Sequence, residues 1–273
     1  MHYLDYLHDI DYLAAIVNSV SDTELCNIIN RLLQLEDNEI VSSTCLFIQD
    51  LVLLSSRHPD CKKFVKGYPE SSIVKTLEQL LFSPSHFIRK QAVYALGKTC
   101  SYKSVPVLNK AFNVFRDTDP ILLPRLIGEI GWLGAENFWV LLDEMIGSQV
   151  YITRWAVIDV LCEFVDDDAR VHSELFQSKL RCIQQLRQDS NILVKSQAEY
   201  EYQLLKFRSS IYELPKSERK KKRKDVERQY KPVYYFDQIS IAFVNFLYSK
   251  RRTQYSIAEL EAFILNITQS SKN

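Results

Sequence analysis

The sequence FIRKQAVYALG, residues 87–97, carries apolar side chains at the spacing of one helix face. The same pattern returns in LLPRLIGEIG, residues 122–131, and again in YITRWAVIDVL, residues 151–161. Matching the three stretches aligns Ile88, Leu122 and Ile152, so the pattern recurs after 34 residues and then after 30. This spacing is typical of a helical pair in a solenoid protein, where each pair buries its apolar face against the next pair. We therefore expect an all-α solenoid of stacked antiparallel helical pairs.

Around these three stretches, helix signals continue along the chain. Ser21 with Glu24, and Ser256 with Glu259, have the spacing of capping boxes that begin helices. Asp119 and Pro120 have the residue types of an N-cap and a first helical position. The periodicity predicts a buried central helix at about 39–57, followed by helices at 87–99, 105–115, 136–146, 152–164, 173–186 and 192–207.

The segment SHFIRKQAVYALGKTCSYKSVPVLNKAF, residues 85–112, resembles a HEAT repeat of the short variety found in bilin lyase subunits. The residues that carry the resemblance are Ile88, Arg89, Ala92, Ala95, Leu96, Gly97, Val105, Pro106 and Leu108. The second copy departs from the pattern at Pro124 and Arg125, and the third lacks the Leu-Gly ending. The resemblance implies a HEAT-like superhelix, and it points to no single function because these residues pack helix on helix.

Three regions follow from the pattern. Residues 1–210 are expected to form the HEAT-like solenoid, with the clearest repeats at 83–165. Residues 211–233 interrupt the periodicity and are expected to be a basic linker or a helical extension. Residues 234–273 are expected to form an atypical helical pair that caps the solenoid.

Composition favours a cytoplasmic helical protein. Only six glycines and eight prolines occur in 273 residues, which disfavours strands and phosphate-binding loops. No apolar run reaches the length of a membrane span, and the first residues do not have the pattern of a signal peptide. The six cysteines form no Cys-x-x-Cys pair and the histidines are scattered, so no metal and no cofactor are expected.

Charge is distributed unevenly although the net charge is zero. Residues 1–60 hold ten acidic and two basic side chains. The segment KSERKKKRK is strongly basic, with Lys216, Arg219, Lys220, Lys221, Lys222, Arg223 and Lys224. Such a run suits a solvated linker, a nuclear import signal or a sequence-independent contact with nucleic acid. It also suits an intramolecular contact with the acidic amino-terminal region.

Catalytic motifs of common hydrolases and kinases do not occur in the chain. Trp132, Trp139 and Trp155 would suit the base-stacking pocket of a helical DNA glycosylase, although residues of this kind are more often packing residues. Gly128, Gly131 and Gly134 are expected to end one helix and allow close packing. A bilin lyase subunit acting on a phycobiliprotein is a second alternative, with Arg154, Trp155 or Cys162 near the chromophore.

The function we expect is a non-catalytic adaptor, scaffold or inhibitor that binds another protein. In a HEAT-like stack the second helix of each pair lines the concave face. The candidate contact residues on these helices are Lys103, Lys110, Arg116, Asn137, Asp143, Glu144, Gln177, Arg181, Gln184 and Gln185. The aromatic carboxyl-terminal helices are a further docking surface. Nucleic-acid binding through residues 216–224 is the third class.

Overall fold

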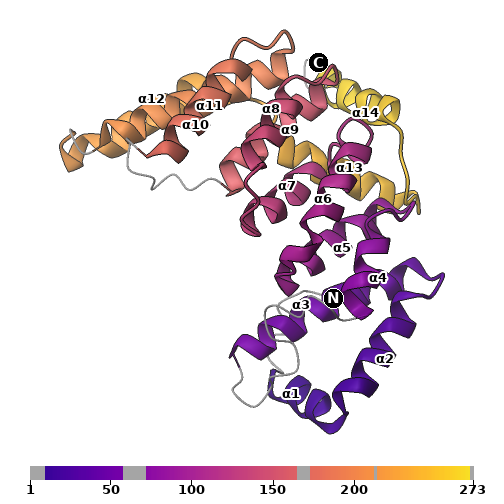
Figure 1. The fold of residues 1–273 in the computed structure, drawn as a ribbon. Coiled ribbons are helices and arrows are strands. Elements are labelled where there is room, and N and C mark those ends of the chain that lie inside the picture. Colours follow the sequence, from indigo (N-terminus) through magenta and orange to yellow (C-terminus); the bar gives the residue numbers. More distant parts are fainter. Residues whose placement is uncertain (1–9, 58–71, 165–172, 212–213, 271–273) are drawn as a thin grey trace. The chain divides into compact units, whose positions relative to one another are not determined.

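Helices joined by short turns make up the computed structural model, which describes residues 10–57, 72–164, 173–211 and 214–270 (Figure 1). These residues form fourteen α-helices and one short 3-10 helix, and they contain no strand. Most helices pack against neighbours in sequence. The all-α prediction is therefore confirmed, and the arrangement as one continuous solenoid stays a prediction. No helix in the described ranges is long and apolar enough to span a membrane.

The helix bounds agree closely with the amphipathic pattern. The first helices are α1 (Ile10–Ser19), α2 (Asp22–Leu33), α3 (Asn38–Arg57), α4 (Ser72–Leu80) and α5 (His86–Thr99). The central ones are η2 (Tyr102–Ser104), α6 (Val105–Phe115), α7 (Leu123–Trp132), α8 (Phe138–Ile146) and α9 (Tyr151–Phe164). The last are α10 (Glu174–Leu186), α11 (Ile192–Ser209), α12 (Lys216–Tyr230), α13 (Phe236–Ser249) and α14 (Ile257–Ser270).

The chain divides into two compact units. The first contains residues 1–111 and 132–135, and the second contains residues 112–131 and 136–273. In the first unit, α3 packs against both α2 and α5 and buries Cys45, Ile48 and Leu51, as expected for a central helix. In the second unit, α9 packs against α8, α10 and α11 and buries Trp155, Ile158 and Leu161 completely.

Serine hydroxyls cap the N-termini of several helices. The Ser21 hydroxyl accepts the backbone N–H of Glu24, and Ser173 accepts that of Phe176 in the same way. At α14 the capping box is reciprocal, since the Ser256 N–H donates to Glu259 Oε2 and the Glu259 N–H donates to Ser256 Oγ. These contacts satisfy backbone donors that have no partner within the helix.

The prediction for Asp119 and Pro120 was wrong. Both lie in the turn between α6 and α7, and α7 begins only at Leu123. The turn is closed by the N–H of Leu122, which donates to the Asp119 carbonyl. Asp119 is 1% exposed, and its carboxylate accepts a hydrogen bond from Tyr255. A tertiary contact therefore uses the side chain that the sequence suggested as a helix cap.

Two arginines, in the first and third copies of the repeated pattern, make the same local contact. Arg89 Nη1 donates to the carbonyls of Ser83 and Pro84, six and five residues before it. Arg154 Nη1 donates to the carbonyls six and five residues before it, those of Ser148 and Gln149. These contacts, with helix starts at His86 and Tyr151, align the two copies at an offset of 65 residues. The sequence alignment gave 64, so its register is shifted by one residue in the third copy.

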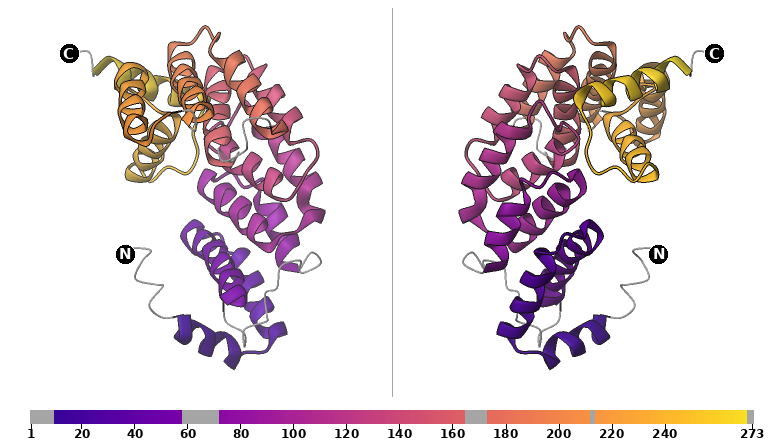
Figure 2. Two further views of the ribbon diagram at one scale, coloured as in Figure 1. Left: turned by 90° about the vertical axis from the view of Figure 1, so that its left-hand side faces the viewer. Right: turned by 90° about the vertical axis from the view of Figure 1, so that its right-hand side faces the viewer.

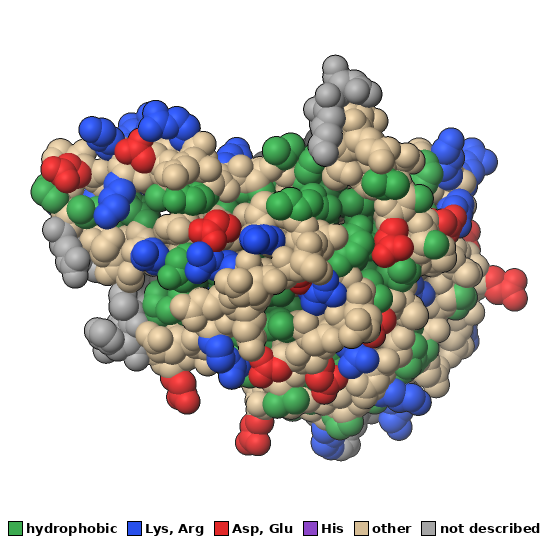
Figure 3. Space-filling model, turned by 90° about the horizontal axis from the view of Figure 1, so that it is seen from above, with side chains coloured by type: hydrophobic (Ala, Val, Ile, Leu, Met, Phe, Trp, Pro, Cys, Tyr) green, Lys and Arg blue, Asp and Glu red, His purple; other side chains and the backbone are tan. Residues whose placement is uncertain are grey.

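The basic segment forms the helix α12, which packs against α11. Of the two alternatives for residues 211–233, residues 216–230 are thus a helical extension. None of its residues is fully buried, and its Lys and Arg side chains gather at the left of Figure 3, where α12 lies in the view of Figure 1.

The carboxyl-terminal helices α13 and α14 form the expected helical pair. They pack against each other, and the Tyr234 hydroxyl donates to the carbonyl of Ile267 at 3.3 Å. α13 also packs against α9, an earlier helix of the second unit (Figure 2). The pair therefore lies beside α9, whereas α12 lies against α11. The start of α13 also contacts α11, since the Phe236 N–H donates to Gln197 Oε1 at 3.0 Å, and the role of the pair as a cap stays a prediction.

Candidate functional site

Exposed polar side chains of α8 and α10 form the candidate protein-binding surface, which we call the α8–α10 face. Its members are Arg116 after α6, then Val140, Asp143 and Glu144 of α8, then Gln177, Arg181, Gln184 and Gln185 of α10. On α8, Asp143 and Glu144 lie three and four positions after Val140, so both are neighbours of Val140 on the helix surface. The structure thus brings seven of the ten predicted contact residues to neighbouring helices of one unit.

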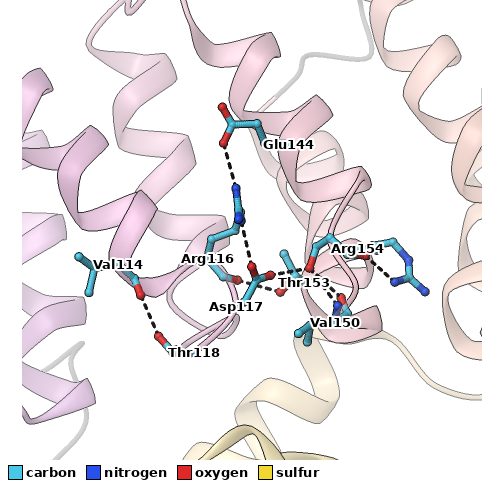
Figure 4. Close-up of polar contacts among 9 residues, drawn as sticks. Val114, Arg116, Asp117, Thr118, Glu144, Val150, Thr153 and Arg154 are labelled. Atoms are coloured by element: carbon cyan, nitrogen blue, oxygen red, sulfur yellow. Dashed lines mark hydrogen bonds and ion pairs between the residues drawn. The ribbon is translucent and has the colours of Figure 1, made fainter.

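Arg116 connects the end of α6 with α8. Its Nη1 atom lies 3.1 Å from Glu144 Oε2, and its Nε atom lies 3.1 Å from Asp117 Oδ2 (Figure 4). The side chains of Arg116 and Glu144 remain 35% and 42% exposed. The guanidinium is therefore held in one place while one side of it stays accessible.

A polar network behind Arg116 fixes its backbone. The Thr153 hydroxyl donates to the Arg116 carbonyl at 2.7 Å, and the Ser148 hydroxyl donates to Asp117 (Figure 4). Burial alone would raise the pKa of Asp117, but the hydrogen bonds from Ser148 and Arg116 hold it below its ordinary value. Sequence analysis missed Asp117, Ser148 and Thr153, because nothing in a linear pattern indicates that these distant residues meet.

A second ion pair connects α8 with α10. Arg181 Nη2 lies 3.3 Å from Asp143 Oδ2, and the two side chains are 54% and 47% exposed. Asp143 and Glu144 are adjacent on α8, yet they reach neighbouring elements on opposite sides, α10 and the end of α6. The two pairs therefore form a ladder, with positive charges at the end of α6 and on α10 and the negative charges between them on α8.

The remaining predicted contact residues lie elsewhere. Lys103 in η2 and Lys110 in α6 belong to the first unit, where both are exposed and the Lys110 Nζ atom lies 5.3 Å from the centre of the Phe82 ring. Asn137 is the N-cap residue of α8. These three are not part of the α8–α10 face as defined by the ion pairs.

The basic helix α12 has eight basic and three acidic side chains, a net charge of +5. Arg223 pairs with Glu227 at 3.0 Å, and Arg228 pairs with Asp225 at the same distance. A shallow hollow on its surface is lined by Ser217, Lys220, Lys221, Lys224, Asp225 and Arg228. The predicted basic patch is therefore an ordered helix face.

Residues suggested for the alternative enzymes are engaged in protein contacts. Trp155 is fully buried, and its Nε1 atom donates to Gln197 Oε1 at 2.6 Å. Arg154 forms two hydrogen bonds with Asp189, at 2.6 and 3.0 Å. Desolvation raises the pKa of the Cys162 thiol above its ordinary value, and the nearby Glu201 carboxylate raises it further.

The other two tryptophans have surroundings that differ from those of Trp155. Trp132 ends α7 and is 71% exposed, and Trp139 packs with its edge against the Phe138 ring. The three tryptophans thus have different environments, one buried, one exposed and one packed on a neighbouring ring.

No group of three or more His, Cys, Asp or Glu residues with metal-binding geometry occurs within the described ranges. Comparison with known proteins found no family model, no curated protein and no solved structure that matches this chain. Any functional conclusion therefore depends on the geometry of the surfaces described above.

Proposed function

We propose that this protein is a non-catalytic adaptor that binds another protein through the α8–α10 face. The observation that carries the proposal is the ladder formed by Arg116–Glu144 and Asp143–Arg181. All four side chains are between 35% and 54% exposed, so each retains hydrogen-bonding capacity toward a partner. We further propose that the helical pairs belong to a HEAT-like solenoid, for which the second helices are the usual binding side.

The ladder suits binding better than it suits stabilisation of the fold. Exposed ion pairs contribute about 0–1 kcal/mol to folding, because solvent screens the charges. Their effect here is to restrict the rotamers of long side chains before a partner arrives, which lowers the entropy cost of association. Arginine is also among the residues enriched at protein interfaces, where it often dominates the binding energy.

The chemistry of the face indicates the kind of partner. Positive and negative groups alternate along it, and Gln177, Gln184 and Gln185 add neutral donors and acceptors on α10. Val140 is 56% exposed and supplies an aliphatic contact on α8. A folded protein with a complementary pattern of charges would satisfy this mixture, and charge complementarity would set the specificity.

The test starts with the tagged full-length protein, purified from nuclease-treated extract of its source cells together with any protein that co-elutes. Binding of the purified partner is then measured for Arg181→Ala and for Arg252→Ala. The two arginines are matched, since each forms an exposed ion pair, and Arg252 pairs with Glu259 at the start of α14.

We expect Arg181→Ala to weaken binding by about 10-fold or more, as for an interface arginine, and Arg252→Ala to leave it unchanged. Equal affinity of the two variants would exclude the α8–α10 face. Failure to recover any stoichiometric protein from nuclease-treated extract would contradict the adaptor function itself.

A further inference from the structure

We propose that α12 is a second binding surface, which contacts the phosphate backbone of a nucleic acid duplex without reading its sequence. This goes beyond the adaptor function, which uses different helices. The surface is the outward face of α12, formed by Ser217, Lys220, Lys221, Lys224 and Arg228 and called the lysine stripe below.

Helical spacing places these residues in one line. They follow each other at i, i+3, i+4, i+7 and i+11, which is one side of an α-helix. At 1.5 Å per residue the stripe extends over about 16 Å. The half-buried Arg219, Val226 and Tyr230 belong to the opposite side, so packing on α11 leaves the stripe exposed to solvent.

The three lysine charges of the stripe have no acidic partner in the part of the chain that the structure describes, whereas Arg228 pairs with Asp225. Acidic residues of α12 pair with arginines, Glu227 with Arg223 and Asp225 with Arg228. In contrast, Lys220, Lys221 and Lys224 are exposed, and in the ranges that the structure describes they make no hydrogen bond or ion pair. Three ammonium groups on adjacent turns therefore face solvent with their charge uncompensated, which creates a local positive potential.

The residue types on the stripe favour a polyanion over other occupants. An amphipathic helix that enters a lipid surface needs an apolar side, and no residue of the stripe is apolar. A protein interface normally needs buried aromatic or aliphatic anchors, which the stripe also does not provide. Lysine is a flexible, strongly hydrated point charge that binds phosphate without requiring a fixed geometry. A regular line of phosphates is the ligand that this composition fits.

Contacts of this kind have a characteristic salt dependence. Each phosphate that is neutralised releases condensed counterions, and log Kobs falls with log salt concentration by about 0.9 per contact on duplex DNA. Three lysine contacts would thus weaken binding by roughly 40-fold between 50 and 200 mM salt. Sequence preference is not expected, because the three unpaired side chains of the stripe are lysines, which act as flexible point charges on phosphates, and Arg228 is already paired with Asp225.

The experiment measures binding of the full-length protein to a fluorescent 20-base-pair DNA duplex of arbitrary sequence, by anisotropy from 50 to 200 mM NaCl. The test variant is K220Q/K221Q/K224Q, which keeps helix-favouring side chains and removes three charges. The control variant is K75Q/K98Q/K250Q, which removes three charges from exposed lysines of other helices. Circular dichroism checks that both variants retain the helical content of the wild type.

We expect the test variant to bind at least about 10-fold more weakly at 50 mM salt, and its salt slope to be smaller by about 0.9 per lysine removed. The control variant should resemble the wild type. Parallel titrations use poly-glutamate and vesicles containing 30% phosphatidylserine. Preference for either of these over DNA would overturn the proposal, as would equal DNA binding by the two variants or a duplex affinity that does not change with salt.

Discussion

The Tyr255 hydroxyl donates a 2.6 Å hydrogen bond to Asp119, 136 residues earlier in the chain. Tyr255 lies between α13 and α14, and its ring also packs edge-on against Phe243 at 5.0 Å. Asp119 lies in the turn between α6 and α7 and is 1% exposed. The contact therefore attaches the carboxyl-terminal pair to the turn before α7, near the start of the second unit in sequence.

We predict that Tyr255→Phe lowers the free energy of unfolding by about 1.5–3 kcal/mol, the usual effect of a hydrogen bond to a charged group. The ring contact with Phe243 is retained, so the loss reports the hydroxyl alone. Urea denaturation followed by circular dichroism measures it. Tyr102→Phe is the matched control, because Tyr102 is 66% exposed and should change stability by less than about 0.5 kcal/mol. Equal stabilities of the two variants would contradict the role of this contact.

Gln197 joins three helices in the core of the second unit. Its Oε1 atom accepts the Nε1–H of Trp155 at 2.6 Å and the backbone N–H of Phe236 at 3.0 Å. We predict that Gln197→Met, which keeps the shape but removes the acceptor, costs about 2–4 kcal/mol because two buried donors lose their partner. Tryptophan fluorescence during denaturation measures the loss. Gln184→Met on exposed α10 is the control, and a similar cost for both would show that Gln197 has no special role.

The sequence predicted the helices well because a helix face is a local property. The pattern around 105–115 gave α6 with the observed bounds, and the pattern around 192–207 gave α11 to within two residues. Periodicity depends only on which side chains recur every three or four positions, and burial in the structure follows that recurrence. The expectation that glycine ends this helix fits Gly134, which has a φ of +73° two residues after α7, whereas Gly128 lies in the middle of α7.

Long-range contacts escaped prediction for a physical reason. Asp119 has the residue type of a helix cap, but in the folded protein its carboxylate accepts a hydrogen bond from Tyr255 of the carboxyl-terminal region. The contact of α13 with α9 could not be predicted either, because the prediction assumed that helices pack in the order of the sequence. In the candidate site, Arg116, Asp143, Glu144 and Arg181 were all predicted as contact residues, but only the structure shows which of them form ion pairs.

Asp189 makes stability depend on pH. Burial alone would raise its pKa, but hydrogen bonds from Arg154 and from the Asn191 N–H lower it below the ordinary 3.8. A carboxyl whose pKa is lower in the folded state stabilises the protein above its unfolded pKa, and this contribution disappears as the pH falls through the folded value. We therefore predict that Asp189→Asn costs about 1–3 kcal/mol at pH 7 and progressively less below pH 3.8.

The partner variant Arg154→Gln tests the cause of this pH dependence. In proteins that carry Arg154→Gln, the further change Asp189→Asn should alter the free energy of unfolding much less, because the ion pair is already absent. Unfolding free energies of the four proteins between pH 7 and pH 2 form the complete cycle. A cost of Asp189→Asn that stays constant over this range would contradict the assigned role of the ion pair.

Gly131 near the end of α7 is required by close packing. A Cβ atom at this position would lie 2.7 Å from Cδ2 and 2.8 Å from Cε2 of the Phe138 ring, well inside contact distance. We predict that Gly131→Ala destabilises the protein by about 1–3 kcal/mol, since the ring at the start of α8 must move. Gly147 is the matched control because a Cβ there meets only ordinary contacts at 3.6 Å, and its φ is −77°. Gly147→Ala should therefore be neutral or stabilise by about 0.4–1 kcal/mol through the entropy of the unfolded chain. Thermal and urea denaturation of both variants measure the contrast, and a stability of Gly131→Ala equal to that of Gly147→Ala would show that the ring of Phe138 moves aside without cost.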